Sequence, residues 1–350
     1  MLNRSNQRIN YFRYLGRKKF QSSESPYYFA YGRTAIKAGL LSCKINTGKK
    51  ILVPEFICDA ALHPFHELGL GIQYYSVKED LSPDWDSVHS GLSTQVAGIM
   101  MVHYFGIPQD IERFTGFARE NNLILIEDNS HGHGGSYQGK MLGLFGDIGI
   151  SSPRKSFPIL NGGTLFLKNA LTLPPLHTEP EPFNVAAAII RYLIGRILDT
   201  YPRAKEMLLN TTEQLAHDSK VKDWCIDKYS YKFLAGYDLQ KAVRTRTQLF
   251  RVWEKWSRSN KLTPLFSSIS DSYAPLAMPL LFGDQNDADK WMDLFKKNHI
   301  AAFKWPYLPR EISETMNSGK NLYDRIVCLP IHLAMKTVET EGYLRNKFKY

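Results

Sequence analysis

An aspartate and a lysine occupy positions in this sequence at which chemistry is expected. Asp128 follows an apolar run at residues 123–126 and precedes several turn-forming residues. Such a run is typical of a buried parallel strand, and ligands of open α/β sheets bind beyond the carboxyl ends of such strands. Lys155 follows on a later loop, ahead of Gly162, Gly163 and a second apolar run. A lysine that forms a Schiff base and a carboxylate that keeps a pyridine nitrogen protonated are two groups that pyridoxal 5'-phosphate requires.

The segments around this pair carry an ordered set of motifs. Residues 102–111 read VHYFGIPQDI, and residues 126–147 begin with IED and end with GD. The first segment resembles the V-H-x-x-G-x-P-x-D-[MI] signature of the DegT/StrS family of sugar aminotransferases, and the second follows that family's pattern in register. Lys155 also lies at the family's spacing from its paired glycines. The resemblance extends from Tyr31 to the LPIH segment at residues 329–332, apart from the middle of the chain.

This resemblance implies a fold and a division into domains. The fold would be the α/β PLP-transferase fold type I, with a mostly parallel sheet of the seven-stranded type and a smaller carboxyl-terminal α/β domain. Alternating strand and helix patterns before Asp128 agree with a parallel sheet covered on both faces. We expect four regions: a basic amino-terminal segment at 1–25, a large cofactor-binding domain at 26–172, a proline-rich connector and helical insertion at 173–235, and a small domain at 236–350.

Apolar periodicity predicts the individual elements. Asp110 is expected to cap a helix whose apolar face is Ile111, Phe114, Phe117 and Ala118. A long helix is expected to begin at Tyr237. Further helices are predicted at 33–43, 57–68, 285–297 and 335–347, and strands at 51–54, 72–77, 97–102, 274–282 and 326–330.

Composition limits the classes of protein to which the chain can belong. Its 350 residues, 43% of them hydrophobic and 22% charged, can bury a large core. No apolar run has the length of a membrane span, residues 1–20 lack a signal core, and the four cysteines have no disulfide or metal-ligand spacing. We therefore expect a cytoplasmic protein without a metal centre.

The net charge of +10 points to anionic small molecules more than to nucleic acid. The basic residues are spread along the chain and form no recognition motif, so no nucleic-acid partner is expected. A positive field favours capture of phosphorylated cofactors and substrates. The densest basic run lies between residues 4 and 19, and we interpret it as a solvated tail. Peripheral contact of this run with an anionic membrane surface remains the alternative.

The resemblance implies roles for individual residues around the cofactor. Lys155 would form the Schiff base and then move a proton between two carbons, and Asp128 would hold the pyridine nitrogen. His131 stands where the family has glutamine, near the phenolic oxygen of the cofactor. Its imidazole can donate the same hydrogen bond, but it adds a titratable group. His133 matches the family's histidine and is interpreted as structural support or chemistry.

The resemblance also implies a phosphate site at the start of the first helix. Arg33 and Thr34 occupy the family's threonine and alanine positions, and backbone donation survives that exchange. Ser152 is the expected phosphate-binding hydroxyl, with Ser151 as the competing candidate because the loop is shorter than in the family. Cys58 stands where the family has an aromatic residue that stacks on the cofactor. Residues 305–306 are interpreted as packing, with the lining of a sugar pocket as the alternative.

Together these features predict a PLP-dependent aminotransferase. It would transfer an amino group from glutamate or glutamine to a keto-sugar nucleotide, in surface polysaccharide or amino-sugar biosynthesis, and act as a homodimer. One alternative is a PLP-dependent sugar dehydratase, but that branch of the family replaces the Schiff-base lysine, so Lys155 argues against it. The other is a cofactor-binding protein without transaminase activity, with a regulatory or scaffold role. Cys58, Arg33 and the lack of a clear counterpart to the family's subunit-crossing asparagine support that alternative.

Overall fold

The computed structural model describes residues 26–168, 171–173, 179–180, 221–315 and 317–347. The basic segment predicted at residues 1–25 lies outside these ranges. Residues 174–178 and 181–220 of the expected connector and insertion lie outside them as well.

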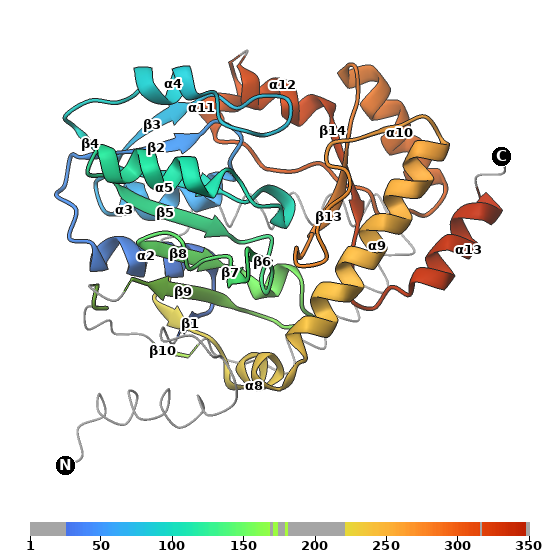
Figure 1. Ribbon diagram of the computed structural model, residues 1–350, viewed down its shortest axis with the longest axis horizontal. Coiled ribbons are helices and arrows are strands. Elements are labelled where there is room, and N and C mark those ends of the chain that lie inside the picture. Colours follow the sequence, from blue (N-terminus) through green and yellow to red (C-terminus); the bar gives the residue numbers. More distant parts are fainter. Residues whose placement is uncertain (1–25, 169–170, 174–178, 181–220, 316, 348–350) are drawn as a thin grey trace.

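A nine-stranded sheet forms the centre of the larger part of the described chain (Figure 1). The five neighbours β3, β2, β4, β5 and β8 run parallel, and β9 returns antiparallel to β8. This order confirms the predicted α/β class with a mostly parallel sheet. The strands in spatial order are β10 (Glu179–Pro180), β11 (Trp224–Cys225), β1 (Tyr27–Phe29), β9 (Gly163–Leu167), β8 (Ile148–Ser151), β5 (Ile124–Asn129), β4 (Val96–Val102), β2 (Lys50–Pro54) and β3 (Gly71–Tyr75).

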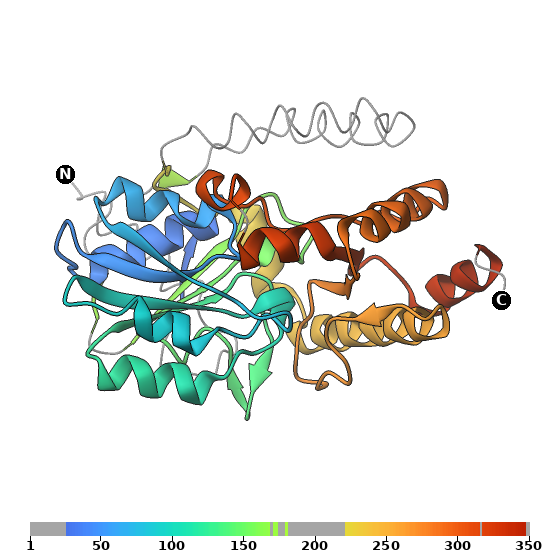
Figure 2. The same cartoon turned by 90° about the horizontal axis from the view of Figure 1, so that it is seen from above.

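Helices cover both faces of this sheet. Figure 2 shows the blue helices α2 (Gly32–Ser42) and α3 (His63–Glu67) on one side of the strands and α5 (Ile111–Glu120) and α4 (Trp85–Ser90) on the other. The Asp110 side chain accepts from the Arg113 amide at 3.1 Å, which confirms the predicted cap. The predicted apolar face of α5 is buried, and each such large side chain contributes about 1.5–3 kcal/mol.

The helix predicted at residues 57–68 is wrong in its extent. The chain instead forms a 3-10 turn, η1 (Asp59–Ala61), and then the short helix α3. Pro64 lies in the first turn of α3, where its missing N–H costs nothing. In a continuous helix from residue 57 the same proline would interrupt the backbone hydrogen bonds and clash with the preceding turn.

A second hydrophobic core belongs to the carboxyl-terminal part of the chain. The long helix α9 (Leu239–Ser259) packs there with α10 (Gln285–Lys297) and α13 (Thr337–Lys347) around a three-stranded antiparallel sheet. The strands of that sheet are β12 (Thr263–Pro264), β13 (Ala277–Leu281) and β14 (Ile326–Pro330). Smaller elements are α8 (Lys228–Gly236), α11 (Arg310–Ser313), α12 (Ser318–Arg325) and the hairpin β6 (Ser136–Tyr137) with β7 (Lys140–Met141).

Within the described ranges, no helix combines the length and the apolar character needed to cross a membrane.

Candidate active site

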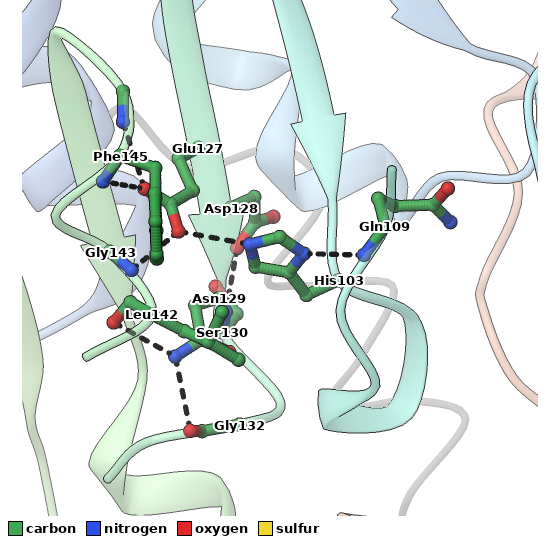
Figure 3. Close-up of polar contacts among 11 residues, drawn as sticks. His103, Gln109, Glu127, Asp128, Asn129, Ser130, Gly132, Leu142, Gly143 and Phe145 are labelled. Carbon is green, nitrogen blue, oxygen red and sulfur yellow. Dashed lines mark hydrogen bonds and ion pairs between the residues drawn. The ribbon is translucent and has the colours of Figure 1, made fainter. Parts of the chain in front are cut away.

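A buried carboxylate fixes the strand end that carries Asp128. Glu127, on β5, accepts hydrogen bonds at Oε1 from the Gly143 amide at 2.6 Å. At Oε2 it accepts from the amides of Phe145 and Gly146, at 2.6 and 2.9 Å. These contacts attach the loop between β7 and β8 to β5 (Figure 3). The position of Asp128 is therefore set by a rigid, fully buried neighbour.

His103 completes the environment of Glu127. Its Nδ1 accepts from the Gln109 amide at 3.1 Å, so Nε2 is the donor to Glu127 Oε1 at 2.9 Å (Figure 3). Burial raises the pKa of Glu127, but the hydrogen bonds from His103 and from the glycine amides outweigh it and lower the pKa overall. The histidine and the glutamate of the two sequence motifs are thus direct partners, and Glu127 stays ionised.

Asp128 presents one unused carboxylate oxygen. Its side chain is buried, and Oδ1 accepts from the Ser130 amide at 2.8 Å. Oδ2 has no hydrogen-bond partner in the part of the chain that the structure describes. A carboxylate oxygen without a protein partner can accept a hydrogen bond from a ligand. Asp128 is therefore suited to bind a protonated ring nitrogen.

Lys155 faces the same space. It ends the 3-10 turn η3 (Pro153–Lys155), and its side chain is accessible to solvent. Surrounding protein atoms nevertheless lower the pKa of its ammonium group, while the nearby Cys58 and Asp128 oppose that shift. Among the described residues the ammonium has no hydrogen bond or ion pair. The structure thus places Lys155 close enough to Asp128 for their charges to interact and leaves the amine without a hydrogen bond.

His131 lies beside this lysine as a neutral donor. Its Nδ1 accepts from the Phe105 amide at 3.1 Å, so the proton of the neutral ring is on Nε2. Burial, and then the charges of Lys155 and Arg246, hold the pKa of His131 well below its usual range. The titration of this ring therefore lies outside the neutral range, and Nε2–H can donate as an amide would.

Arg246, on α9, holds the loop that contains both histidines. Its fully buried guanidinium donates to the carbonyl oxygens of His131, His133 and Pro275 at 2.6, 3.3 and 2.8 Å. Burial lowers the pKa of Arg246 to about 9, and burial with the charge of Arg246 lowers that of His133 to about 3. Nothing in the local sequence distinguished this arginine from its exposed neighbours on the helix, and its role depends on contacts distant in sequence.

The start of α2 forms a cradle for an anion. A helix begins with amides that have no partner inside the helix, and Tyr31, the N-cap, provides no side-chain cap. A Cβ atom placed on Gly32 would lie 3.7 Å from the hydroxyls of both Ser130 and Ser152. Neither hydroxyl has a partner among the described residues. Two free hydroxyls and a helix start suit a phosphate group, and sequence analysis missed Ser130, because its place is set by the turn after β5.

The hydroxyls of Thr34 and Ser151, two residues of the expected phosphate site, are engaged elsewhere. Thr34 Oγ1 donates to the Lys222 carbonyl at 2.9 Å, which ties α2 to the segment before β11. Ser151 Oγ is hydrogen-bonded to His133 Nδ1 at 2.8 Å. These contacts favour Ser152 over Ser151, and they leave Thr34 with its backbone amide as its contribution to the cradle.

Gly163 allows this cradle to form. A Cβ atom at this position would lie 2.3 Å from the carbonyl carbon and oxygen of Tyr31 and 2.7 Å from the Gly32 amide nitrogen. Strand β9 therefore approaches the start of α2 more closely than any residue with a side chain permits. The paired glycines after Lys155 thus link the lysine loop to the anion cradle.

Arg33 and Cys58 are two positions near this site at which the sequence departs from the family pattern. The Arg33 guanidinium carbon lies 5.3 Å from the centre of the Tyr31 ring, and that of Arg154 lies 5.4 Å from the same ring. Cys58 is half-buried, and burial raises the pKa of its thiol, so the thiol stays protonated near Lys155. A protonated thiol can pack against a ring but provides no aromatic face.

The arrangement of strands and helices is that of the pyridoxal-phosphate-dependent aminotransferases. PseC from Helicobacter pylori, an aminotransferase involved in the biosynthesis of pseudoaminic acid, superposes with a TM-score of 0.68 at 16% identity, covering 99% of this chain and 91% of that one. NtdA from Bacillus subtilis with bound cofactor PMP superposes with a TM-score of 0.61 at 13% identity, covering 100% of this chain and 78% of that one. At these identities the likeness establishes the fold.

Residues 27–172 match the model of the DegT/DnrJ/EryC1/StrS aminotransferase family. The match confirms the resemblance found in the motifs. The GDP-perosamine synthase of Escherichia coli O157:H7 is 30% identical over 144 residues, which cover 41% of this chain and 40% of that enzyme. The chain therefore aligns with less than half the length of this relative.

Proposed function

We propose that the protein is a pyridoxal-phosphate-dependent aminotransferase that transfers an amino group to a keto-sugar nucleotide. The observation that carries this proposal is the pairing of an unengaged lysine amine, Lys155, with the unpaired Oδ2 of Asp128, next to the anion cradle at Gly32. The sugar nucleotide as substrate is supported by the names of relatives such as GDP-perosamine synthase. Glutamate or glutamine as amino donor is supported by relatives such as the L-glutamine:2-deoxy-scyllo-inosose aminotransferase of Streptomyces kanamyceticus, 24% identical over 136 residues.

The residues present fit pyridoxal phosphate. Asp128 Oδ2 would hold the ring nitrogen, and His131 Nε2 would donate to the phenolic oxygen. The hydroxyls of Ser130 and Ser152 and the amides at the start of α2 would hold the phosphate. When bound, the cofactor supplies a carbonyl group that condenses with amines and a protonated ring that withdraws electrons.

In this proposal the protein moves a proton with Lys155. Asp128 and His131 fix the protonation of the groups around the cofactor ring. Desolvation by surrounding protein atoms lowers the pKa of Lys155, which increases the fraction of free amine able to accept a proton from the substrate carbon. The Asp128 carboxylate would keep the ring nitrogen of the bound cofactor protonated, and a charge-assisted bond of this kind contributes about 1.5–3 kcal/mol. His131 stays neutral beside Lys155, so it donates a hydrogen bond without adding a second positive charge.

The decisive experiment combines colour with product formation. The purified protein, supplied with pyridoxal phosphate, should acquire a visible absorption band that borohydride bleaches and that glutamate or glutamine shifts to shorter wavelength. A set of keto-sugar nucleotides should then be screened by mass spectrometry for an amine product. Lys155→Ala should lose the borohydride-sensitive band, whereas Lys241→Ala, which removes an exposed lysine of α9, should keep it.

The outcomes separate this proposal from its alternatives. A protein that stays colourless contradicts the proposal. An absorption band that neither glutamate nor glutamine shifts supports the alternative of a cofactor-binding protein without transaminase activity. The departures at Cys58 and Arg33 are the observations that favour this alternative. A dehydratase would release water from the sugar without taking up nitrogen, and Lys155 is the residue that argues against it.

We also propose that the active form is a homodimer, because sites of this fold are completed across a two-fold interface. Sedimentation velocity on the active protein tests this directly. A fully active monomer contradicts it.

A further inference from the structure

One aromatic side chain from the carboxyl-terminal part of the chain lies directly against the Lys155–Asp128 site. The Trp305 ring centre is 4.4 Å from that of His131, in an edge-to-face arrangement. Lys155 Nζ lies 6.0 Å from the same ring centre, within the range of a cation–π contact. Trp305 therefore packs against His131 and lies within cation–π range of Lys155, the two residues that would flank the bound cofactor.

Three further rings hold Trp305 in this position. Phe105, Phe56 and Tyr104 meet it edge-to-face, with ring centres at 5.5, 5.6 and 6.4 Å. Phe56 and Phe105 are fully buried, and Trp305 itself is only half-buried. One part of the indole is thus packed against a rigid aromatic cluster, and the rest is accessible.

The segment that carries Trp305 is joined to the segment that carries Cys58. The Asp59 amide, directly after Cys58, donates to the Tyr307 carbonyl at 2.9 Å. Cys58 and Trp305 each lie close enough to Lys155 to interact with it. Two neighbouring segments thus reach the same amine, one with a thiol and the other with a large ring.

We propose that Trp305 is a positioning residue that supplies the aromatic wall for the bound cofactor ring, in place of the ring that is absent at Cys58. This inference rests on the proposed function, since it concerns the same site. An aromatic wall stabilises the bound ring by offset or edge-to-face packing and excludes water from it. The carboxyl-terminal part of the chain would thereby contribute to holding the cofactor, beside the amino-terminal part that holds its phosphate and nitrogen.

The test measures binding without covalent chemistry. Pyridoxamine phosphate has no carbonyl group and does not condense with Lys155, so titration of cofactor-free protein by calorimetry reports the non-covalent site. We expect Trp305→Ala to weaken its binding roughly tenfold, which corresponds to about 1.4 kcal/mol. Trp305→Phe, which keeps a ring, should bind within about threefold of the native protein. Trp291→Ala is the matched control, because Trp291 packs in the second core against Trp256 and Phe295.

Cys58→Phe provides a second, independent test. If both positions serve one wall, this substitution should strengthen binding in the Trp305→Ala background and leave it unchanged or weaker in the native background, where the wall is already present. An equal effect in both backgrounds overturns the proposal. Thermal unfolding by circular dichroism identifies any variant that is not folded. If Trp305→Ala does not fold, the binding of pyridoxamine phosphate is compared between Trp305→Phe and the native protein.

Two results separate this inference from the proposed function. Native protein that binds neither pyridoxal phosphate nor pyridoxamine phosphate defeats the proposed function itself. Native binding together with unchanged affinity in Trp305→Ala overturns only the role of Trp305. A loss of equal size in Trp291→Ala also overturns it, because the effect would then come from general destabilisation of the carboxyl-terminal core.

Discussion

Replacing Glu127 by glutamine should destabilise the strand end that carries Asp128. The carboxylate accepts four hydrogen bonds, two at each oxygen, from the His103 ring and three backbone amides. Glutamine occupies the same volume but turns one oxygen into an NH2 group, which cannot accept. Whichever way the amide is oriented, one pair of buried donors loses its acceptor.

The magnitude follows from those two lost bonds. A hydrogen bond to a charged group contributes about 1.5–3 kcal/mol, so Glu127→Gln should cost about 3–6 kcal/mol of unfolding free energy. In a chain of this size, a cost of that order lowers the thermal midpoint by on the order of 10 °C. Glu120→Gln, at the exposed end of α5, changes the same charge and should move the midpoint little.

The assay is thermal unfolding followed by circular dichroism at neutral pH. A midpoint for Glu127→Gln within about 2 °C of the native value would refute the reasoning, because the network would then contribute nothing measurable. The cofactor affinity of the folded variant should also fall, since Asp128 is the next residue on the strand.

Three further predictions concern the loop with two histidines and the anion cradle. Arg246→Met leaves backbone carbonyls without a donor and should lower the unfolding free energy by about 2–4 kcal/mol, whereas Arg244→Met, at an exposed position of the same helix, should not. Because the pKa of His133 falls from 6.5 to about 3 on folding, its contribution is complete above pH 6.5 and is lost towards pH 3, by up to about 1.4 kcal/mol per pH unit. His133→Asn should flatten that part of a stability–pH curve, and an unchanged curve would contradict the assignment. Gly163→Ala should disturb the start of α2 and weaken pyridoxal phosphate binding, while Gly236→Ala, with no atom within 4 Å of the added carbon, should not.

Local patterns in the sequence predicted the elements whose structure is decided locally. The helix predicted at 285–297 is α10, and the strand predicted at 326–330 is β14, with the same bounds. Asp110 caps α5 because its side chain reaches an amide only three residues away. The motif residues that bring Asp128 to a strand end were also visible, since a strand followed by turn formers has few alternatives.

Other parts of the site depend on contacts distant in sequence and could not be predicted in this way. Thr34 binds a carbonyl at residue 222, and Arg246 binds carbonyls at residues 131 and 133. Ser130 joins the anion cradle only because the turn after β5 directs it towards Gly32. No periodicity or capping rule contains that information. The pairing of the motif residues Glu127 and His103 is likewise a consequence of β4 and β5 lying side by side.

The hypothesis of an idle cofactor-binding protein depends on the departures at Arg33 and Cys58 and on the lack of a clear counterpart to the family's subunit-crossing asparagine. The structure gives a physical account of the departures at Arg33 and Cys58, and also of the one at His131. His131 is a neutral N–H donor, which is what the replaced amide would supply. Arg33 leaves the backbone amides of the helix start in place, and Ser130 and Ser152 provide hydroxyls near them. Cys58 lacks a ring, but Trp305 places one 6.0 Å from the Lys155 amine. In the described part of the chain neither the Lys155 ammonium nor Asp128 Oδ2 has a hydrogen bond or an ion pair, so both remain available for chemistry.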